Sequence, residues 1–359
     1  MKTTSCLSLL LLVSLVLFGF AQAEEPAPYK IGMVYSLSGP AEAWASYGRQ
    51  AAEMAAAEIN AAGGLNGRQL KLIFEDSKTT PAGSVAAYKK LVNVDRVDAL
   101  VGDVWDFVTN PMIPLARQDR KVLIAPTVVS SAIDNPGDYF FTMGTKLELT
   151  EQAIEKFFAV NPEVKSTAIV CWDDHWGRAY LKAWKSVIQK RGIDILEEPC
   201  VYGFDYDYRS DITRIARKKP AAVIMGYQED RIIKRMREQG LNSKVLTTSN
   251  VVDVLHQQRL PAVDLEGVYF TDWDPAAEFQ TSFFKAWNRA PLFEAHSHYE
   301  VIRSIARGFE QNPDDLLAGL KTLRYDGVAG LVDFTRGFDV NQSVAVLKVI
   351  RGGKIELAR

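Results

Sequence analysis

Short apolar runs alternate with longer amphipathic stretches through the first third of the chain. Each apolar run has the length of a buried strand, and each amphipathic stretch has a helical period. Gly63 and Gly64 follow the first helical stretch, and Thr80 is placed to cap the second one before Pro81. The predicted strands are Lys30–Ser36, Gln69–Glu75, Ala99–Val101 and Val122–Ala125, and the predicted helices are Ser46–Ala62, Pro81–Val92 and Asn110–Gln118.

The same rhythm begins again after residue 165. Gly240 stands just past a helical stretch, as a C-cap glycine does. From Ala276 the chain reads as helical until Leu323, and strand patterns then close the sequence around a Gly352-Gly353 turn. The strands predicted here are Ser166–Cys171, Ile193–Pro199, Ala221–Met225, Lys244–Thr247, Leu331–Phe334 and Ser343–Arg351, and the helices are Gly177–Arg191, Arg209–Lys218 and Asp230–Gln239.

This order of elements predicts an α/β fold made of two Rossmann-like halves. Strands separated by helices form parallel βαβ units, with helices on both faces of the sheet. In open parallel sheets, ligands bind beyond the carboxyl ends of the strands. Two such halves facing each other would form a cleft, so the loops after the strands are the candidate functional segments.

The first 23 residues predict export. One early charge, Lys2, precedes an apolar run from Leu9 to Leu17, and the segment ends in Ala21-Gln22-Ala23, a pattern typical of signal-peptidase cleavage. No later apolar stretch approaches the length that spans a bilayer. The chain is therefore expected to act outside the cytoplasm.

Composition narrows the range of partners. The 359 residues carry a formal net charge of -2, which is too near neutral to favour nucleic acid or an anionic membrane surface. Cys171 and Cys200 follow the predicted signal peptide, at the ends of predicted neighbouring strands. In an oxidising compartment they could form a disulfide, and two free buried thiols remain the alternative. Their spacing fits no zinc motif.

Several motifs, in a constant order along the whole mature chain, resemble those of the branched-chain amino-acid-binding proteins of bacterial ABC transporters. Each also has a physical reading: Asn66-Gly67, for example, makes a tight turn into the next strand. The motifs are Ser38-Gly39-Pro40, Glu58-Ile59-Asn60, Gly63-Gly64-Leu65-Asn66-Gly67, Glu75-Asp76, Val101-Gly102, Ala125-Pro126, Trp176-Gly177 and the segment from Tyr325 to Gly330.

The resemblance implies a type I periplasmic binding fold, with two α/β lobes joined by three crossovers. Lobe 1 would comprise residues 24–144 and 274–329, and lobe 2 residues 145–273 and 330–359, with hinges near residues 142–145, 271–273 and Gly330. It further implies a periplasmic monomer without a cofactor or metal, which binds a small molecule in the cleft, does no chemistry on it and delivers it to an ABC permease in the inner membrane.

Carrying the family pattern over by position predicts a set of ligand-facing residues on the loops after the strands. In amino-acid-binding members, the loop after the third strand supplies a small hydroxyl for the ligand carboxylate. Here that place holds Asp106, which would repel a carboxylate in a dry cleft. The predicted ligand-binding residues are Trp44, Trp105, Asp106, Thr127, Val128, Val129, Trp176, Tyr227, Asn250 and Trp273.

The aromatic members of this set indicate the kind of ligand. Indole and phenol rings bury a large area and favour planar or cationic guests. An aromatic wall with one carboxylate therefore predicts an amine, a quaternary ammonium or a polar aromatic metabolite rather than leucine, isoleucine or valine. The alternative is that some tryptophans are lobe core and that Asp106 caps the following helix.

Functions of other classes find less support in the sequence. A hydrolase of the α/β type would need a G-x-S-x-G elbow, which the chain lacks. His296 and His298 could bind a metal, but an H-x-H pair at a helix start is more often a surface pair. A module that senses a ligand for a membrane receptor or kinase would use the same closed form, so the sequence does not separate sensing from transport.

Overall fold

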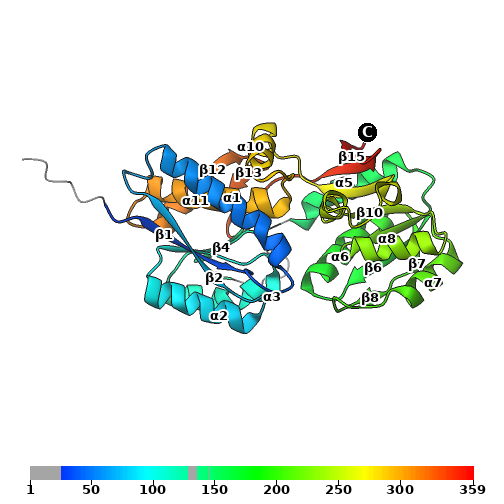
Figure 1. The fold of residues 1–359 in the computed structure, drawn as a ribbon, viewed down its shortest axis with the longest axis horizontal. Helices are drawn as coiled ribbons and strands as arrows, with labels where there is room; N and C mark the ends of the chain where they lie inside the picture. The colour runs from blue at the N-terminus through cyan, green and yellow to red at the C-terminus, as the bar shows by residue number, and fades with distance from the viewer. Residues whose placement is uncertain (1–25, 128–135, 145) are drawn as a thin grey trace, which may run out of the picture.

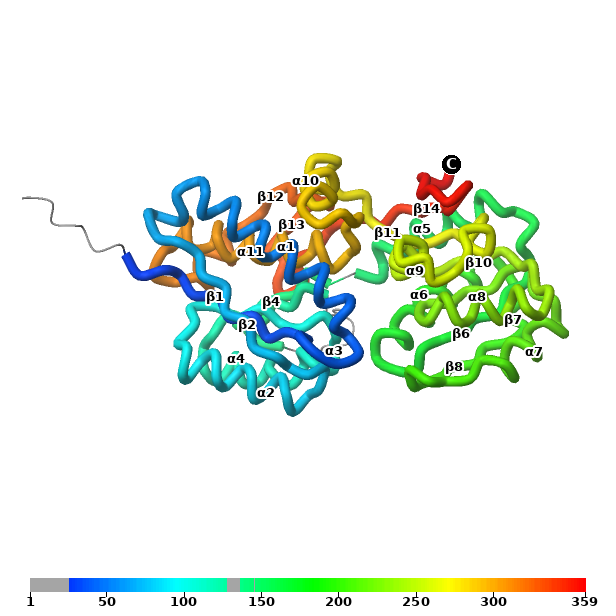
Figure 2. The backbone as a smooth tube through the Cα atoms, viewed as in Figure 1, coloured from blue at the N-terminus to red at the C-terminus, as the bar shows by residue number. Residues whose placement is uncertain are grey.

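The computed structural model describes residues 26–127, 136–144 and 146–359. Figure 1 shows an elongated molecule of two α/β lobes side by side, and Figure 2 shows the chain passing between them. We call the part built on a five-stranded sheet lobe 1 and the part built on an eight-stranded sheet lobe 2. The predicted signal peptide, residues 1–23, lies outside the described residues.

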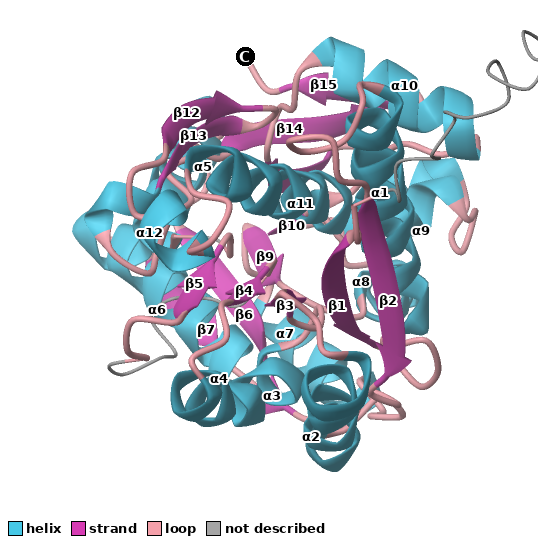
Figure 3. Ribbon diagram, turned by 90° about the vertical axis from the view of Figure 1, so that its left-hand side faces the viewer, coloured by secondary structure: helices cyan, strands magenta, loops and turns pink. Residues whose placement is uncertain are grey.

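Lobe 1 has a parallel sheet between two layers of helices (Figure 3). The strand order is β2-β1-β3-β4-β5, and all pairs are parallel. Its strands are β1 (Tyr29–Tyr35), β2 (Leu70–Asp76), β3 (Ala99–Val101), β4 (Leu123–Ala125) and β5 (Phe140–Thr142). Its helices are α1 (Glu42–Ala61), α2 (Pro81–Lys90), α3 (Asp106–Thr109), α4 (Ile113–Asp119), α10 (Ala277–Trp287), α11 (Phe293–Gln311) and α12 (Leu316–Leu320).

Alternate residues of β1 account for this layering. Ile31 and Met33 pack into the core beneath α1 and α11, whereas Val34 packs into the core beneath α2. Both faces of the sheet are thus buried, as in other parallel sheets. The predicted cap is confirmed, because the Thr80 hydroxyl accepts a hydrogen bond from the amide of Gly83 at 3.0 Å.

Lobe 2 has the strand order β15-β14-β11-β10-β9-β6-β7, with β8 paired to β6. The β14 and β15 pairings are antiparallel and the others are parallel, so this sheet is mixed rather than purely parallel. Its strands are β6 (Ser166–Trp172), β7 (Asp194–Glu197), β8 (Cys200–Val201), β9 (Ala222–Met225), β10 (Lys244–Thr248), β11 (Val268–Asp272), β14 (Val346–Arg351) and β15 (Lys354–Leu357). Its helices are α5 (Leu147–Val160), α6 (His175–Lys190), α7 (Arg209–Lys218), α8 (Glu229–Glu238) and α9 (Val251–His256).

The chain passes between the lobes after β5, after β11 and before β14. The first two places coincide with the hinges predicted near residues 142–145 and 271–273. Gly330, the third predicted hinge, lies instead in the hairpin of β12 (Arg324–Gly327) and β13 (Gly330–Asp333). Thr142 at the end of β5 forms a parallel β-bridge with Asp339. The chain therefore runs beside β5 of lobe 1 before it crosses to β14 of lobe 2.

Candidate ligand-binding cleft

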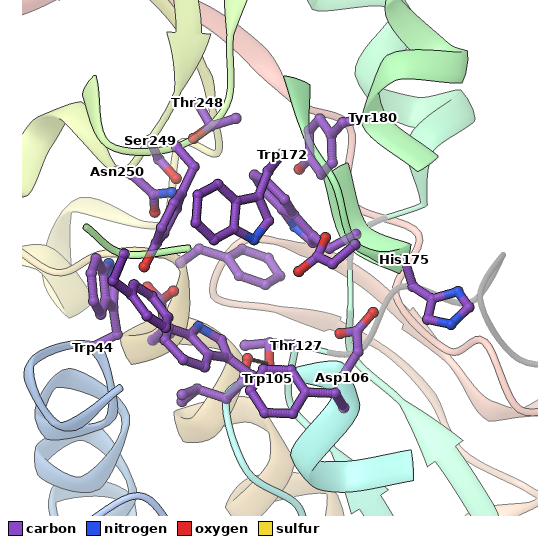
Figure 4. A pocket seen from close by; sticks show the side chains of 18 of the residues that line it. Trp44, Trp105, Asp106, Thr127, Trp172, His175, Tyr180, Thr248, Ser249 and Asn250 are labelled. Atoms are coloured by element: carbon purple, nitrogen blue, oxygen red, sulfur yellow. Dashed lines mark hydrogen bonds between the residues drawn. The ribbon is translucent and has the colours of Figure 1, made fainter. Parts of the chain in front are cut away.

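A cavity lies between the two lobes, where loops from both sheets face each other (Figure 4). Its volume is about 140 Å³, close to the ~150 Å³ that accommodates a benzene ring. The lining residues are Trp44, Val104, Trp105, Asp106, Phe107, Thr127, Trp172, Asp174, His175, Trp176, Tyr180, Tyr202, Phe204, Tyr227, Thr248, Ser249, Asn250, Trp273, Phe293 and Glu294.

Lobe 1 presents two indoles and a carboxylate. Trp44 lies in the first turn of α1, and Trp105 is the residue before α3, so each follows the end of a strand. Their ring centroids are 6.0 Å apart, at an interplanar angle of 45°. Asp106 is 8 % exposed and is the first residue of α3. Trp105 occupies the N-cap position and Asp106 lies in the first turn, so Asp106 is not the N-cap residue of this helix.

Thr127 holds two cleft loops together. Its hydroxyl donates a hydrogen bond of 2.6 Å to the carbonyl oxygen of Val104, which links the loop after β4 to the loop after β3. Because a hydroxyl has a single hydrogen to donate, Thr127 can offer a guest only its oxygen lone pairs.

Lobe 2 presents Trp176, Tyr227 and Asn250. Trp176 lies in the first turn of α6, and its ring centroid is 4.5 Å from that of Tyr180. A Cβ at Gly226 would lie 2.9 Å from the Trp184 ring and 3.2 Å from the Trp176 ring, so the glycine lets both indoles pack against the end of β9. Asn250 is the N-cap residue of α9, and its amide donates to the Gly226 carbonyl at 3.4 Å.

Six aromatic residues that line the cleft were not among those predicted: Phe107, Trp172, Tyr180, Tyr202, Phe204 and Phe293. Trp172 is the last residue of β6, and its ring centroid is 4.7 Å from that of Tyr227. Phe204 follows β8, and its ring centroid is 5.8 Å from that of Trp172. The predicted strand ended at Cys171, and β8 was not expected as a separate strand, so the loop after it was not predicted to face the cleft.

A disulfide secures this part of the cleft. Cys171 on β6 and Cys200 on β8 are register partners, with Cα atoms 4.4 Å apart, and they are covalently joined. This answers the choice that the sequence left open between a disulfide and two free thiols. The bond ties β8, and the aromatic loop after it, to β6, the strand that ends in Trp172.

Rings from opposite lobes touch across the cavity. Trp105 of lobe 1 stacks on Phe204 of lobe 2, with centroids 5.6 Å apart and planes 11° from parallel. The ring centroid of Trp44 in lobe 1 is 5.9 Å from that of Tyr227 in lobe 2. Such contacts have the geometry of favourable aromatic pairs, so they stabilise the arrangement in which the lobes are close together.

The structure brings the predicted residues together wherever it describes them. Trp44, Trp105, Asp106, Thr127, Trp176, Tyr227, Asn250 and Trp273 all line the cavity. Val128 and Val129 lie outside the described residues. Trp273, which is 3 % exposed, follows β11 at a chain crossing and packs on Phe293 with centroids 4.4 Å apart. That these residues bind a ligand stays a prediction.

The cavity is acidic. Three carboxyl groups, of Asp106, Asp174 and Glu294, line it, and its described lining residues include no lysine or arginine. Burial raises the pKa of Glu294 to about 7 and also raises the pKa of Asp174, against a lowering by the hydrogen bond from the Gly177 amide. Burial disfavours the charged form of an acid, and His175, which also lines the cavity, partly offsets this effect at Asp174.

A second buried acid lies behind the aromatic wall. Glu229 follows Tyr227 by two residues, is 3 % exposed, and accepts a hydrogen bond of 2.9 Å from the hydroxyl of Thr247. Burial raises its pKa to about 7. Burial also raises the pKa of Tyr227, so this phenol stays neutral and can donate a hydrogen bond into the cavity.

The histidine pair is not on the surface, contrary to expectation. His296 and His298 lie in the buried helix α11, 4 % and 0 % exposed, and burial lowers the pKa of each to about 3. Among the described residues, no group of three or more His, Cys, Asp or Glu could hold a metal ion. No helix within the described ranges is long and apolar enough to cross a membrane.

Comparison with known proteins agrees with this architecture. The family model described as "Periplasmic binding protein" matches residues 28–354. The "Leu/Ile/Val-binding protein homolog 3" of Brucella melitensis is 26% identical over 321 residues, which is 86% of each chain. The "Leucine-, isoleucine-, valine-, threonine-, and alanine-binding protein" of Pseudomonas aeruginosa is 24% identical over 92% of each chain.

Solved structures show the same fold. The branched-chain amino acid transporter substrate-binding protein LivJ from Streptococcus pneumoniae, in complex with isoleucine, has a TM-score of 0.83 at 20% identity, covering 92% of this chain and 99% of its own. A solute-binding protein of an ABC transporter from R. palustris, in complex with benzoate, has a TM-score of 0.81 at 17% identity, covering 92% of this chain and 95% of its own.

Proposed function

This chain belongs to the periplasmic binding protein family, with relatives among the branched-chain amino-acid-binding proteins, and we propose that it is the solute-binding component of an ABC importer. It captures a small amino-acid-like metabolite that bears an amine or an aromatic ring. The solute is held in the cleft between the lobes and released unchanged to a permease of the inner membrane. The signal sequence predicted at residues 1–23 directs the chain to the periplasm.

The observation that supports this proposal most is the aromatic enclosure of the cavity from both sides. Trp44 and Trp105 come from lobe 1, and Tyr227 and Phe204 come from lobe 2. A guest lying between them contacts both lobes only when the lobes are together. Since a ligand shifts a conformational equilibrium only through its extra contacts in one state, such a guest favours the closed form.

The lining favours a guest other than an aliphatic amino acid. Asp106 lies in the loop where family members supply a hydroxyl for the ligand carboxylate, and Thr127 has its hydroxyl hydrogen engaged by a backbone carbonyl. Neither residue can therefore donate a side-chain hydrogen bond to a ligand carboxylate. Flat rings and a cationic group would instead gain from the indole faces.

The experiment is a thermal-shift screen of the mature protein against amino acids, amines, aromatic acids and amides, followed by calorimetry of the compounds that raise the Tm. Binding to the folded state alone raises the Tm. Trp105→Ala should weaken the binding of each such compound at least tenfold, because aromatic contacts of this kind contribute about 1 kcal/mol beyond the area they bury.

The matched control is Trp287→Ala. Trp287 lies on α10, outside the cavity, and is 37% exposed. Its removal should leave affinity unchanged. If Trp105→Ala and Trp176→Ala both bind as tightly as the unmodified protein, the cleft is not the binding site.

A further inference from the structure

The carboxyl group of Glu294 lines the cleft without a cationic side chain paired to it within the described ranges. Glu294 is the second residue of α11, the long helix that packs against α1, and its side chain lines the cavity between the lobes. Within the described ranges no side chain hydrogen-bonds or ion-pairs with its carboxyl group, which accepts a hydrogen bond from its own backbone amide. The neighbouring charged groups that act on it are two more acids, Asp253 on α9 and Asp272 on β11.

An ionised carboxyl group in this position destabilises the folded protein unless a positive charge or a hydrogen-bond donor offsets its loss of hydration. Removing a carboxylate from water is unfavourable, and Asp253 and Asp272 repel it further, although Arg259 and Lys348 pair with those two acids at 3.0 Å. Glu294 is only half-buried, but a carboxyl group with a raised pKa in a cleft is a feature of functional sites, where a ligand can supply a partner for the charged form.

A second unsatisfied group lies beside it. The Nε1–H of Trp273, a residue that is 3 % exposed and lines the same cavity, has no acceptor among the described residues. Trp273 packs on Phe293, the residue before Glu294. The indole N–H is a donor only, so it is available to an acceptor atom of a guest in the cavity.

We propose that Glu294 is the counter-charge for the guest, and that the guest is a small organic cation without a carboxylate group. Glu294 and the acids Asp106 and Asp174 all line the cavity, and no lysine or arginine is among its described lining residues. The ammonium group of the guest lies against Glu294, its apolar part lies among the aromatic rings, and a neutral oxygen of the guest accepts from Trp273.

This assignment rests on the proposed function, since it names the guest of the same cleft. It also excludes a class of guest that the fold alone would allow. A carboxylate in the cavity would lie among three acidic side chains that line it, with no lysine or arginine among the described lining residues, and like charges repel there. Relatives of the guest that carry a carboxylate are therefore rejected.

The test compares three compounds that share a phenol ring: tyramine, a cation; tyrosine, a zwitterion; and 4-hydroxyphenylacetate, an anion. Choline and putrescine extend the set of cations. Calorimetry and thermal shift at pH 7.5 should detect binding of at least one cation, and the two carboxylate compounds should bind at least tenfold more weakly than tyramine or not at all.

Glu294→Gln keeps the shape of the side chain and removes its charge, so it should weaken cation binding ten- to a hundredfold while the circular dichroism spectrum stays the same. The matched control is Glu278→Gln, at the second residue of α10, where the side chain is exposed. That variant should bind as the unmodified protein does.

Two results would overturn the assignment. One is that no cation binds, or that a cation binds equally well to the Glu294→Gln variant. The other is that 4-hydroxyphenylacetate or tyrosine binds more tightly than tyramine. If such an anion binds and Trp105→Ala abolishes its binding, the cleft still captures a solute, so the proposed function stands and only the charge of the guest is wrong.

Discussion

The hydroxyl of Tyr47 donates a hydrogen bond of 2.8 Å to Oδ1 of Asp253, and this bond joins the two lobes. Tyr47 lies on α1 of lobe 1 and Asp253 on α9 of lobe 2, and both are nearly fully buried. The guanidinium of Arg289 lies 3.5 Å from the centre of the Tyr47 ring, and that of Arg259 donates to Asp253 at 3.0 Å. The closed arrangement thus has a polar contact in addition to its aromatic ones.

Tyr47→Phe should weaken ligand binding without unfolding the protein. The ring stays beneath Arg289, whereas the hydrogen bond that exists only when the lobes meet is lost. A hydrogen bond to a charged group contributes about 1.5 to 3 kcal/mol, so affinity should fall by roughly ten- to a hundredfold, as measured by calorimetry with a compound found in the screen. X-ray scattering should show a more open average shape.

Tyr88→Phe is the control for that variant. Tyr88 is equally buried and donates to Asp119 at 3.0 Å, but both residues belong to lobe 1. Its loss should lower the Tm and leave ligand affinity as it was. Equal effects of the two variants on affinity would mean that the Tyr47 bond has no special part in closure.

Removing the disulfide should destabilise lobe 2 and loosen the aromatic loop. The bond closes a loop with a sequence separation of 29, for which chain-entropy arguments give about 3 to 4 kcal/mol. The double variant Cys171→Ser, Cys200→Ser should therefore unfold at lower denaturant concentration and bind the ligand more weakly, because Phe204 follows β8. Reductant should destabilise the unmodified protein and leave the double variant unaffected.

The stability of the protein should depend on pH through Glu229. Its pKa is about 7 when folded, because of burial, against about 4.5 when unfolded. The folded state therefore holds a proton that the unfolded state has lost, and this stabilisation disappears as pH rises from about 4.5 to 7. Glu229→Gln has no such proton to lose, so its stability relative to the unmodified protein should increase between pH 5 and 8, by about 3 kcal/mol at most.

Urea unfolding at several pH values measures this effect. Glu238→Gln, on the exposed last turn of the same helix, is the control and should follow the unmodified protein at every pH. A difference between the Glu229→Gln variant and the unmodified protein that stays constant from pH 5 to 8 would show that Glu229 does not titrate in this range.

Binding of a cation such as tyramine should tighten with rising pH. Glu294 has a pKa of about 7 in the free protein, with Asp253 and Asp272 facing it, and it must be ionised to hold an ammonium group. Between pH 6 and 8 its ionised fraction rises about tenfold, while an alkyl amine keeps its proton. Asp174, whose pKa burial also raises, acts in the same direction. Glu294→Gln should flatten most of this profile, and an unchanged profile in that variant would contradict the prediction.

The alternation of apolar runs and helical stretches predicted the parallel core of both lobes. β3 (Ala99–Val101) and α7 (Arg209–Lys218) have the predicted bounds, because short buried strands and caps leave local signals. α5 (Leu147–Val160) and β11 (Val268–Asp272) were not predicted. Both adjoin the chain crossings, where the order of elements along the sequence no longer follows one sheet.

Cleft residues could be predicted from the sequence when they follow a predicted strand, and could not be predicted when they come from other segments. Trp105, Trp176 and Tyr227 stand on such loops, so topology alone brings them together. Glu294 comes from the start of a helix that belongs to neither loop set, and Phe204 from a loop whose strand has only two residues. Their positions in the cleft depend on how the lobes pack together, and the pattern of apolar and polar residues along a single segment does not predict that packing.

The most direct test of the account is a crystal structure of the mature protein with the compound that raises its Tm most. We expect the compound between the lobes, in contact with Trp105 and Tyr227, with its cationic group against Glu294. A compound bound outside this cavity, with the Trp105 and Phe204 rings still stacked on each other and the space between the lobes unfilled, would contradict the account.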